Sequence, residues 1–228
     1  GKCATVCSYN AIIVQQRPCA AACGMDAISS DENGKADIDY DKCVSCGQCL
    51  VNCPFGAIAD KSQIFQTIRA IQSGERVYAA VAPAFVGQFG PKVTPGKLRA
   101  AMKKLGFADV FEVAIGADLC AAQEAQDFLD EVPEKIPFMA TSCCPAWVKY
   151  CETKYPEFVP NLSTCRSPQQ MFGAVVREYY KDPEKNEGKK IVSVSIMPCT
   201  AKKEEILRPE SFTNGKQDVD YVLTTTEV

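Results

Sequence analysis

The stretch MATSCCPAW, at residues 139–147, gives the strongest indication of the architecture of this chain. In it a short apolar run ends at two adjacent cysteines, a proline and the only tryptophan. Neighbouring residues project in different directions, so Cys143 and Cys144 are not expected to bind the same metal ion. One can be a ligand while the other is a free thiol. A second stretch of this type, MPCTAK at 197–202, follows the apolar run 191–196. We therefore expect two strand ends that each deliver a thiol.

Outward from this stretch, apolar runs alternate with amphipathic segments over residues 61–228. Continuous apolar runs predict buried strands, and apolar residues three and four positions apart predict helices. We expect strands at 77–82, 110–115, 138–140, 191–196 and 219–223, and helices at 60–74, 94–106, 118–131, from 145, 168–180 and 200–207. Because the strands are apolar on both faces, the pattern indicates an α/β fold, a mostly parallel sheet with flanking helices.

Ligands of such sheets bind outside the carboxyl ends of the strands. Three expected strand ends carry unusual sequence, 82–84, 141–145 and 197–199, and we expect them to converge on one cofactor. Two of them lead directly into helices, whose N-terminal N–H groups favour an anionic ligand such as a thiolate-bound cluster. Lys202, one turn after Cys199, would add a hydrogen-bond donor.

Two of the expected helices have ends or faces that can be assigned to residues. Asp60 is expected to cap the first helix, with Gln63 reaching back to it. The apolar face of this helix is expected to consist of Ile64, Phe65, Ile68 and Ile71. The helix at 118–131 is expected to turn inward Ala122, Ala125, Phe128 and Leu129.

The amino-terminal segment contains an internal repeat of Cys, three residues, Cys, three residues, Ala-Ile. Its copies are GKCATVCSYNAI from residue 1, CAAACGMDAI from residue 19 and GQCLVNCPFGAI from residue 47. Cys43 and Cys46 precede the last copy and complete C-x2-C-x2-C-x3-C-P, the bacterial ferredoxin pattern for a 4Fe-4S cluster. We therefore expect residues 1–60 to form a small ferredoxin-like iron-sulfur domain with two 4Fe-4S clusters, and residues 61–228 a second domain.

The cysteines of this first domain supply ligands for two clusters by count, although their pairing to individual clusters stays open. They are Cys3, Cys7, Cys19, Cys23, Cys43, Cys46, Cys49 and Cys53. A zinc site with four cysteine ligands is the alternative, but such sites usually show two C-x2-C pairs. The first copy of the repeat also begins at its third expected position, which suggests that the chain is cut inside a motif.

The composition excludes several classes of function. The 228 residues include 14 cysteines and no histidine, so imidazole ligands and histidine bases are excluded. Clustered, regularly spaced cysteines in a chain of this length favour metal binding over a disulfide scaffold. The net charge of −3, with scattered basic residues, argues against nucleic-acid and anionic-membrane partners. No apolar run approaches a membrane span and no signal peptide opens the chain, so we expect a cytoplasmic location.

TSCCPAW together with MPCTAKKEE, downstream of a ferredoxin-like segment, resembles the first two of three signatures of the FeFe hydrogenases, and the resemblance covers essentially the whole chain. The active site of that family, the H-cluster, is a 4Fe-4S cubane joined through one cysteine to a diiron unit with CO, cyanide and azadithiolate. The resemblance implies that Cys144 and Cys199 ligate the cubane and that Cys143 passes protons to the bridging amine. It also implies that Lys202 hydrogen-bonds a diiron cyanide and that Met197 packs beside the diiron unit. Further positions matching the lining of the pocket are Ala82, Pro83, Pro168 and Gln169.

The chain departs from the family pattern in two ways. The third signature, which supplies the other two cubane cysteines, is absent before Val228, so we expect residues 61–228 to be a partial H-cluster domain from a longer protein. Well-known members carry glutamates in the helix before TSCCP, where this chain has Gln123 and Gln126. Since an amide does not relay protons as a carboxylate does, this implies an atypical proton path, although Ser163 is retained and Glu124 is near.

The resemblance implies a hydrogenase that exchanges electrons with a soluble carrier such as ferredoxin and depends on H-cluster maturation proteins. A hydrogenase-like protein of iron-sulfur assembly or sensing, without the diiron unit, is the alternative. Such proteins typically lose the first cysteine of the pair, so the presence of Cys143 and Lys202 favours the enzyme. A plain ferredoxin would leave the residues beyond 60 unexplained. The cysteines outside these motifs, Cys120, Cys151 and Cys165, are expected to be buried small apolar residues.

Overall fold

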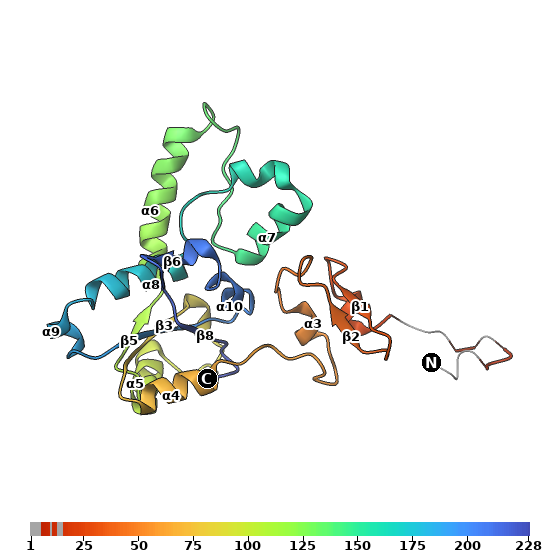
Figure 1. The fold of residues 1–228 in the computed structure, drawn as a ribbon, viewed down its shortest axis with the longest axis horizontal. Coiled ribbons are helices and arrows are strands. Elements are labelled where there is room, and N and C mark those ends of the chain that lie inside the picture. Colours follow the sequence, from red (N-terminus) through yellow and green to blue (C-terminus); the bar gives the residue numbers. More distant parts are fainter. Residues whose placement is uncertain (1–5, 10, 13–15) are drawn as a thin grey trace. The chain divides into compact units, whose positions relative to one another are not determined.

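The computed structural model describes residues 6–9, 11–12 and 16–228, and its chain forms two compact units (Figure 1). The first unit comprises Gly1–Cys43 and Gly47–Asp60, and the second comprises Val44–Cys46 and Lys61–Val228. Cys3, one of the predicted cluster ligands, lies outside the described residues. No helix in the described part of the chain is both long enough and apolar enough to span a membrane.

The first unit consists of short elements around its cysteines. Its elements are α2 (Pro18–Ala21), β1 (Ile28–Ser30), β2 (Ala36–Ile38) and α3 (Gln48–Val51). The strands pair antiparallel, with Ile28 opposite Ile38. Asp31 shapes the turn between them, because its carboxylate accepts the N–H of Asn33 at 3.0 Å and that of Lys35. Each short helix carries one of the repeated cysteines, Cys19 in α2 and Cys49 in α3.

The second unit alternates strands and helices along the chain. Its first half contains α4 (Ile64–Gln72), β3 (Arg76–Val81), the 3-10 turn η1 (Pro83–Phe85), α5 (Pro95–Leu105), β4 (Asp109–Glu112), α6 (Ala114–Glu131) and α7 (Pro145–Lys154). Its second half contains η2 (Pro156–Asn161), α8 (Pro168–Tyr179), α9 (Pro183–Asn186), β5 (Ile191–Ile196), α10 (Ala201–Glu205), η3 (Pro209–Ser211), β6 (Phe212–Thr213), β7 (Lys216–Gln217) and β8 (Tyr221–Leu223).

A four-stranded sheet with the order β4-β3-β5-β8 forms the centre of the second unit, and all of its neighbouring strands are parallel. The strand β5 occupies the residues expected of it, 191–196, and pairs along its whole length with β3, from Arg76 opposite Ile191 to Val81 opposite Ile196. The predicted fold class, a parallel sheet with flanking helices, is therefore confirmed.

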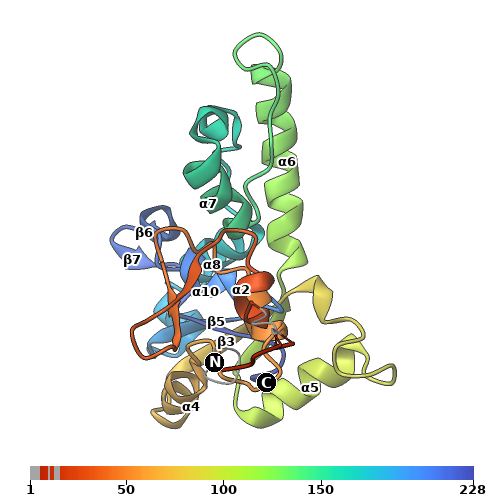
Figure 2. The same ribbon diagram turned by 90° about the vertical axis from the view of Figure 1, so that its right-hand side faces the viewer.

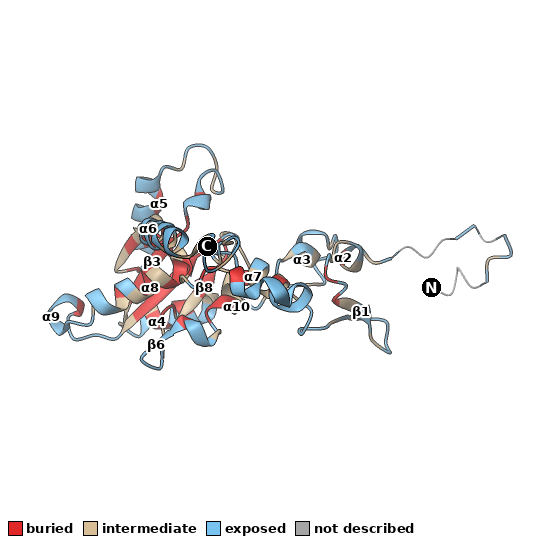
Figure 3. Cartoon of the chain, turned by 90° about the horizontal axis from the view of Figure 1, so that it is seen from above, coloured by how far each residue is buried: buried red, intermediate tan, exposed pale blue. Residues whose placement is uncertain are grey.

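Both faces of this sheet are buried, as Figure 3 shows for the strands. Val77 and Ala79 of β3 pack with Met102 of α5 on one face, which α4 and α5 cover. Tyr78 of β3 packs with Phe172 of α8 on the other face. Because side chains alternate along a strand, a run that is apolar at every position fills both layers. This explains why β3 reads as a continuous apolar run.

The expected cap and apolar face of α4 are wrong in part. Gln63 occupies the cap position without a side-chain cap, and its Oε1 instead accepts the N–H of Val222 in β8 at 2.7 Å. Phe65 and Ile68 are exposed, whereas Thr67 and Ala70 are the buried residues of the helix. The small residues face the sheet because α4 lies close to it, and Ile64 and Ile71 pack at the edges of this contact.

The helix α6 is longer than expected and extends well beyond the sheet (Figures 1 and 2). It begins at Ala114, so the strand expected at 110–115 ends early as β4. Ala122, Ala125, Phe128 and Leu129 are all exposed rather than inward, and the buried residues are Gly116 and Cys120. The strand expected at 138–140 is absent, since only an isolated bridge joins Ala140 to Leu162.

Candidate functional site

The stretch 139–147 is held in place by backbone hydrogen bonds to the last residue of η2 and to the segment that follows it. The N–H of Ala140 donates to the carbonyl of Asn161 at 2.8 Å, and the N–H of Ser163 donates to the carbonyl of Ala140 at 2.8 Å. Beyond this anchor Cys143 and Cys144 are exposed, and Cys144 forms the N-cap of α7. The helix therefore presents the positive end of its dipole at Cys144, a position that favours a thiolate ligand.

Lys202 connects the two signature stretches. Its Nζ donates to the carbonyl of Cys143 at 2.8 Å and to both carboxylate oxygens of Glu205, at 2.9 and 3.0 Å. The two side chains are largely buried, with exposed fractions of 13% for Lys202 and 8% for Glu205. All three protons of the ammonium therefore have partners, and the helix α10 is tied to the loop that carries Cys143.

Gln169 extends this network from α8. Its Nε2 donates to Glu205 Oε2 at 2.9 Å, while its Oε1 is buried without a hydrogen-bond partner among the described residues. A buried amide oxygen without a partner is costly, so it marks a position where a ligand or water with a donor would be stabilised. Sequence reasoning missed Glu205, although its position three residues after Lys202 in α10 was a signal that the two side chains could meet.

The remaining predicted pocket residues lie around the carboxyl end of the sheet. Ala82 and Met197 follow the paired strands β3 and β5 and belong to one buried cluster. Pro83 is exposed at the start of η1, and Pro168 begins α8 after the cap Ser167, whose Oγ accepts the N–H of Gln170. The structure thus brings the ends of β3 and β5 together, and Lys202 joins them to Cys143.

The partly buried side of α6 carries the carboxylate of Glu124, whereas the amides of Gln123 and Gln126 lie on its exposed side. Gln123 and Gln126 are exposed and donate to Asp127 at 2.8 Å and Asp130 at 3.1 Å. Glu124 has a carboxylate oxygen that is buried and without a partner among the described residues. The amides at 123 and 126, which suggested an atypical proton path, therefore point to solvent, and Glu124 is the residue that the helix presents inward.

Ser163, the retained hydroxyl, is also buried near this helix. Its Oγ accepts the N–H of Cys165 at 3.1 Å. Of the cysteines expected to be buried apolar residues, Cys120 and Cys151 are buried and Cys165 is partly buried. Cys165 is in addition close to a second sulfur, that of Cys120.

In the first unit, two copies of the cysteine repeat make the same contact. The N–H of Ala27 donates to Cys23 Sγ at 3.4 Å, and the N–H of Ala57 donates to Cys53 Sγ at 3.3 Å. Backbone N–H groups, that of Phe55 first and that of Ala57 next, hold the pKa of Cys53 below its ordinary value. Such N–H donors stabilise a thiolate, the form that binds iron, so the donor set fits an iron-sulfur cluster.

The cysteines of the first unit differ in exposure: Cys19 is buried, Cys46 is exposed, and Cys7, Cys23, Cys43, Cys49 and Cys53 are intermediate. Among the described residues, no three cysteine, aspartate or glutamate side chains lie close enough together to hold a single metal ion. Cys143, Cys144 and Cys199 likewise do not lie close enough together to hold a single metal ion. A cubane presents separate iron atoms to its ligands, so its thiolates stand further apart than those around one ion.

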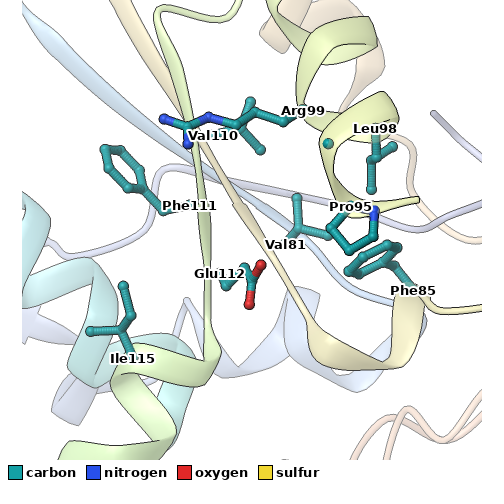
Figure 4. A pocket seen from close by; sticks show the side chains of 10 residues that line it. Val81, Phe85, Pro95, Leu98, Arg99, Val110, Phe111, Glu112 and Ile115 are labelled. Carbon is teal, nitrogen blue, oxygen red and sulfur yellow. The ribbon is translucent and has the colours of Figure 1, made fainter. Parts of the chain in front are cut away.

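Two cavities lie in the second unit, and neither is lined by a predicted catalytic side chain. One, of about 390 Å³, lies between β3, β4 and α5, with Arg99 and Glu112 among apolar side chains such as Phe85 (Figure 4). The other, of about 260 Å³, is lined by residues that include Ser163, Cys165 and Glu205. The second cavity therefore reaches the residues beside the candidate site.

Comparison with known proteins finds related families and relatives. The family model "Iron only hydrogenase large subunit, C-terminal domain" matches residues 75–228, and "LdpA Fe-S cluster-binding domain" matches residues 14–64. The NADP-reducing hydrogenase subunit HndD of Solidesulfovibrio fructosivorans is 41% identical over 82% of this chain and 34% of its own length. Cytosolic iron-sulfur assembly component 3 of Bos taurus is 30% identical over 85% of this chain and 45% of its own length.

A solved structure shares the fold. The FeFe hydrogenase HydA1 of Chlamydomonas reinhardtii, in a single-substitution variant, superposes with a TM-score of 0.66 at 33% identity, covering 73% of this chain and 46% of that one. The chain thus spans less than half the length of each of these three relatives. The relatives include both hydrogenases and a cytosolic assembly component.

Proposed function

Since the chain belongs to the iron-only, or FeFe, hydrogenase family, we propose that the complete protein catalyses the reversible reduction of protons to dihydrogen. The observation that carries this proposal is the contact between Lys202 and the carbonyl of Cys143, at 2.8 Å. It joins the two signature stretches, TSCCPAW and MPCTAKKEE, at the carboxyl end of the sheet. Ligand sites of α/β folds lie at this edge.

The residues at this edge suit an H-cluster. Cys144 and Cys199 are the proposed cubane ligands, and both are free thiols with access to solvent. When bound, the cofactor supplies the metal site at which protons and electrons combine. Lys202 supplies a buried positive charge that would attract a cyanide, although its three protons bond to Cys143 and Glu205 in this structure, and Gln169 supplies an amide whose oxygen has no partner among the described residues. The walls of the pocket are proposed to be Met197, Ala82, Pro83 and Pro168.

Proton transfer is assigned to Cys143. Its thiol is exposed beside the proposed ligand Cys144, while its own carbonyl is fixed by Lys202. Glu124 and Ser163 are the polar groups on the inward side of α6 and of the loop before α8, and we assign them to the path that resupplies Cys143. This route includes a carboxylate, one of the side-chain groups that transfer protons in enzymes.

Electrons are proposed to reach this site through two 4Fe-4S clusters in residues 1–60, held by the repeated cysteines. The N–H donors to Cys23 and Cys53 support this role, because hydrogen bonds to sulfur tune cluster potentials. The electron partner is proposed to be a soluble carrier such as ferredoxin, the cofactor to come from H-cluster maturation proteins, and the location to be the cytoplasm.

A non-catalytic role in iron-sulfur assembly is the second candidate, favoured by the similarity to cytosolic iron-sulfur assembly component 3. Cys143 and Lys202 argue for the enzyme, since an assembly protein without a diiron unit has no use for a proton donor beside it. Infrared bands of metal-bound CO and cyanide in the matured complete protein would distinguish the two. A matured protein that lacks these bands would exclude hydrogenase activity.

The roles of the adjacent cysteines can be separated by substitution in the complete, matured protein. Cys143→Ala is expected to keep the infrared bands and lose about 10²- to 10⁴-fold in hydrogen turnover, because a proton carrier is missing. Cys144→Ala is expected to lose cofactor, seen as reduced iron content and weaker bands. If Cys143→Ala turned over hydrogen at the parent rate with equal cofactor content, the assignment of the proton donor would be wrong.

A further inference from the structure

Two cysteines outside every recognised motif meet where α6 packs against the loop before α8. Cys120 Sγ and Cys165 Sγ are 3.7 Å apart, although the residues are 45 positions apart in the chain. Cys120 is 4% exposed in the middle of α6. Cys165 lies in a fixed loop, because its N–H donates to Ser163 Oγ and its carbonyl accepts the hydroxyl of Ser142 at 2.9 Å.

Packing keeps these sulfurs together. One turn before Cys120, a Cβ on Gly116 would lie only 2.3 Å from the carbonyl oxygen of Pro168, so α6 touches the start of α8 directly. A disulfide bond is about 2.05 Å long, and rotation about the Cα–Cβ bonds of two cysteines already in van der Waals contact can close most of the remaining gap. The pair is therefore poised for a bond.

We propose that Cys120 and Cys165 form a reversible thiol–disulfide site that takes its oxidising equivalents from hydrogen peroxide. A small oxidant can reach Cys165, which lines the cavity of about 260 Å³. The Cys165 sulfur attacks one peroxide oxygen, the O–O bond breaks, and Cys165 becomes a sulfenic acid as water leaves. The Cys120 sulfur then attacks Cys165 Sγ, forming the S–S bond and releasing a second water. A dithiol reverses the reaction by exchange.

The pair is suited to slow, lasting oxidation and not to rapid peroxide removal. Burial raises the pKa of Cys120 to about 12, and burial also raises the pKa of Cys165. Because the thiolate is the nucleophile, little of either thiol reacts at neutral pH. We expect the rate of disulfide formation to rise about tenfold per pH unit between pH 7 and 8.

The disulfide would act on the candidate site, an effect that rests on the proposed function. It would tie α6 to the loop at 165 and enclose the whole MATSCCPAW stretch in a covalent loop. Cys143 and Glu124 are close enough for their charges to contribute to the raised pKa of Cys120. Oxidation would therefore stiffen the segments that carry the proposed proton donor and its supply, and hydrogen turnover should fall.

The disulfide itself is tested without any assay of turnover. The cluster-loaded chain is treated anaerobically with limiting hydrogen peroxide, alkylated with N-ethylmaleimide in denaturant, digested and mapped by mass spectrometry. We expect a peptide that joins Cys120 to Cys165 and disappears with dithiothreitol. Cys120→Ala should instead accumulate a dimedone-reactive sulfenic acid on Cys165. Cys151 is the matched control: it is fully buried, its sulfur contacts no other sulfur among the described residues, and it should stay alkylatable.

Alkylation of Cys120 and Cys165 to the same extent before and after peroxide, or equal oxidation of Cys151, would overturn the inference. The effect on the site is tested in the matured complete protein. Turnover should fall at least severalfold on oxidation and recover with dithiothreitol, and Cys165→Ala should not respond. A mapped disulfide with unchanged turnover would overturn control of the site. A complete protein inactive in every state would contradict the proposed function but leave the peptide map valid.

Discussion

The carboxylate of Glu205 is the residue-scale feature on which the arrangement around Cys143 depends. It accepts two bonds from Lys202 and one from Gln169, and only 8% of its side chain is exposed. A buried ammonium needs such a partner, because an unpaired charge in a poorly solvated site costs several kcal/mol. The position of the Lys202 ammonium is therefore set by Glu205 and, through it, by Gln169.

Glu205→Gln is expected to lower the free energy of unfolding by about 3 kcal/mol, because it leaves Lys202 buried without its counter-charge. Urea denaturation followed by circular dichroism would measure the change. The matched control is Glu75→Gln, which breaks the pair with the exposed Lys190 and should cost less than about 1 kcal/mol. If the two variants lost the same free energy of unfolding, the buried pair would stabilise the fold no more than the pair of Glu75 with Lys190.

At the scale of elements, the contact of α6 with α8 depends on a residue without a side chain. A Cβ at Gly116 would meet the carbonyl oxygen of Pro168 at 2.3 Å and the Cβ of Phe172 at 3.0 Å. Backbone cannot move aside as a flexible side chain can. The close approach of these helices therefore requires glycine at position 116.

Gly116→Ala is expected to destabilise the second unit by about 3 kcal/mol through overpacking. Gly96→Ala, in the exposed first turn of α5, is the control, since a Cβ there has no atom within 4 Å, and it should be neutral or stabilising by up to about 1 kcal/mol. Thermal denaturation of the two variants beside the parent compares them directly. A parent-like midpoint for Gly116→Ala would disprove the tight contact.

Asp109, the first residue of β4, carries a carboxylate whose contribution to the stability of the fold depends on pH. Burial acts to raise the pKa of Asp109, but hydrogen bonds from Arg99, from the N–H of Val110 and from Lys103 outweigh it and hold the pKa below the ordinary 3.8. A carboxyl group whose pKa is lower in the folded protein than in the unfolded chain stabilises the fold at pH values above its pKa in the unfolded chain. This stabilisation is lost as the pH falls through the folded pKa.

Asp109→Asn should therefore be less stable than the parent at pH 6. The difference in free energy of unfolding should be less than about 1 kcal/mol, because Arg99 and Lys103 are exposed to solvent, and it should shrink towards pH 3. Chemical denaturation midpoints of both proteins across this range measure the difference. Glu178→Gln, which breaks an exposed pair with Lys181, is the control and should show no such trend. A difference that stays constant with pH would refute the ionic origin.

The elements also show what sequence pattern can and cannot predict. The strand β5 and the helix α8 were predicted almost to the residue, because an apolar run and a Ser-Pro start are local signals. The face of α4 was misjudged, since the closeness of the sheet selects Thr67 and Ala70 over larger apolar residues. The segment 138–140 reads as a strand but finds only a single bridge partner. In each failure the deciding partner is distant in the chain.

At the scale of the whole molecule, the motifs predicted the family, and the comparisons confirm it. The roles of the individual site residues stay predictions. The bond from Gln169 to Glu205, the Cys120–Cys165 contact and the inward position of Glu124 could not be predicted, because they depend on how α6, α8 and α10 approach one another. Spacing in a sequence identifies thiols that can bind iron. It does not identify which side chains will surround them.

Anaerobic reconstitution of the chain, followed by iron and acid-labile sulfide analysis, tests the proposed content of the first unit. We expect the iron and sulfide of two 4Fe-4S clusters, in equal amounts, with an electron paramagnetic resonance signal on reduction. Cys53→Ala should lose one cluster, whereas Cys151→Ala, the control outside the repeat, should keep both. Bound zinc in place of iron would contradict the cluster assignment.

The order of the strands affects how this polypeptide acquires its structure during synthesis. The central pair of the sheet, β3 and β5, joins segments far apart in the chain, and Glu75 and Lys190, which form an ion pair next to it, are 115 positions apart. The strand β3 cannot pair with β5 until β5 has left the ribosome. Closing the long loop between the two strands costs conformational entropy, and the contacts that offset this cost form only after closure. During that interval β4 is the only strand of the sheet that can pair with β3, and the other edge of β3 keeps its backbone N–H and C=O groups unpaired. We therefore expect the nascent chain to need chaperone protection until residue 196 has emerged.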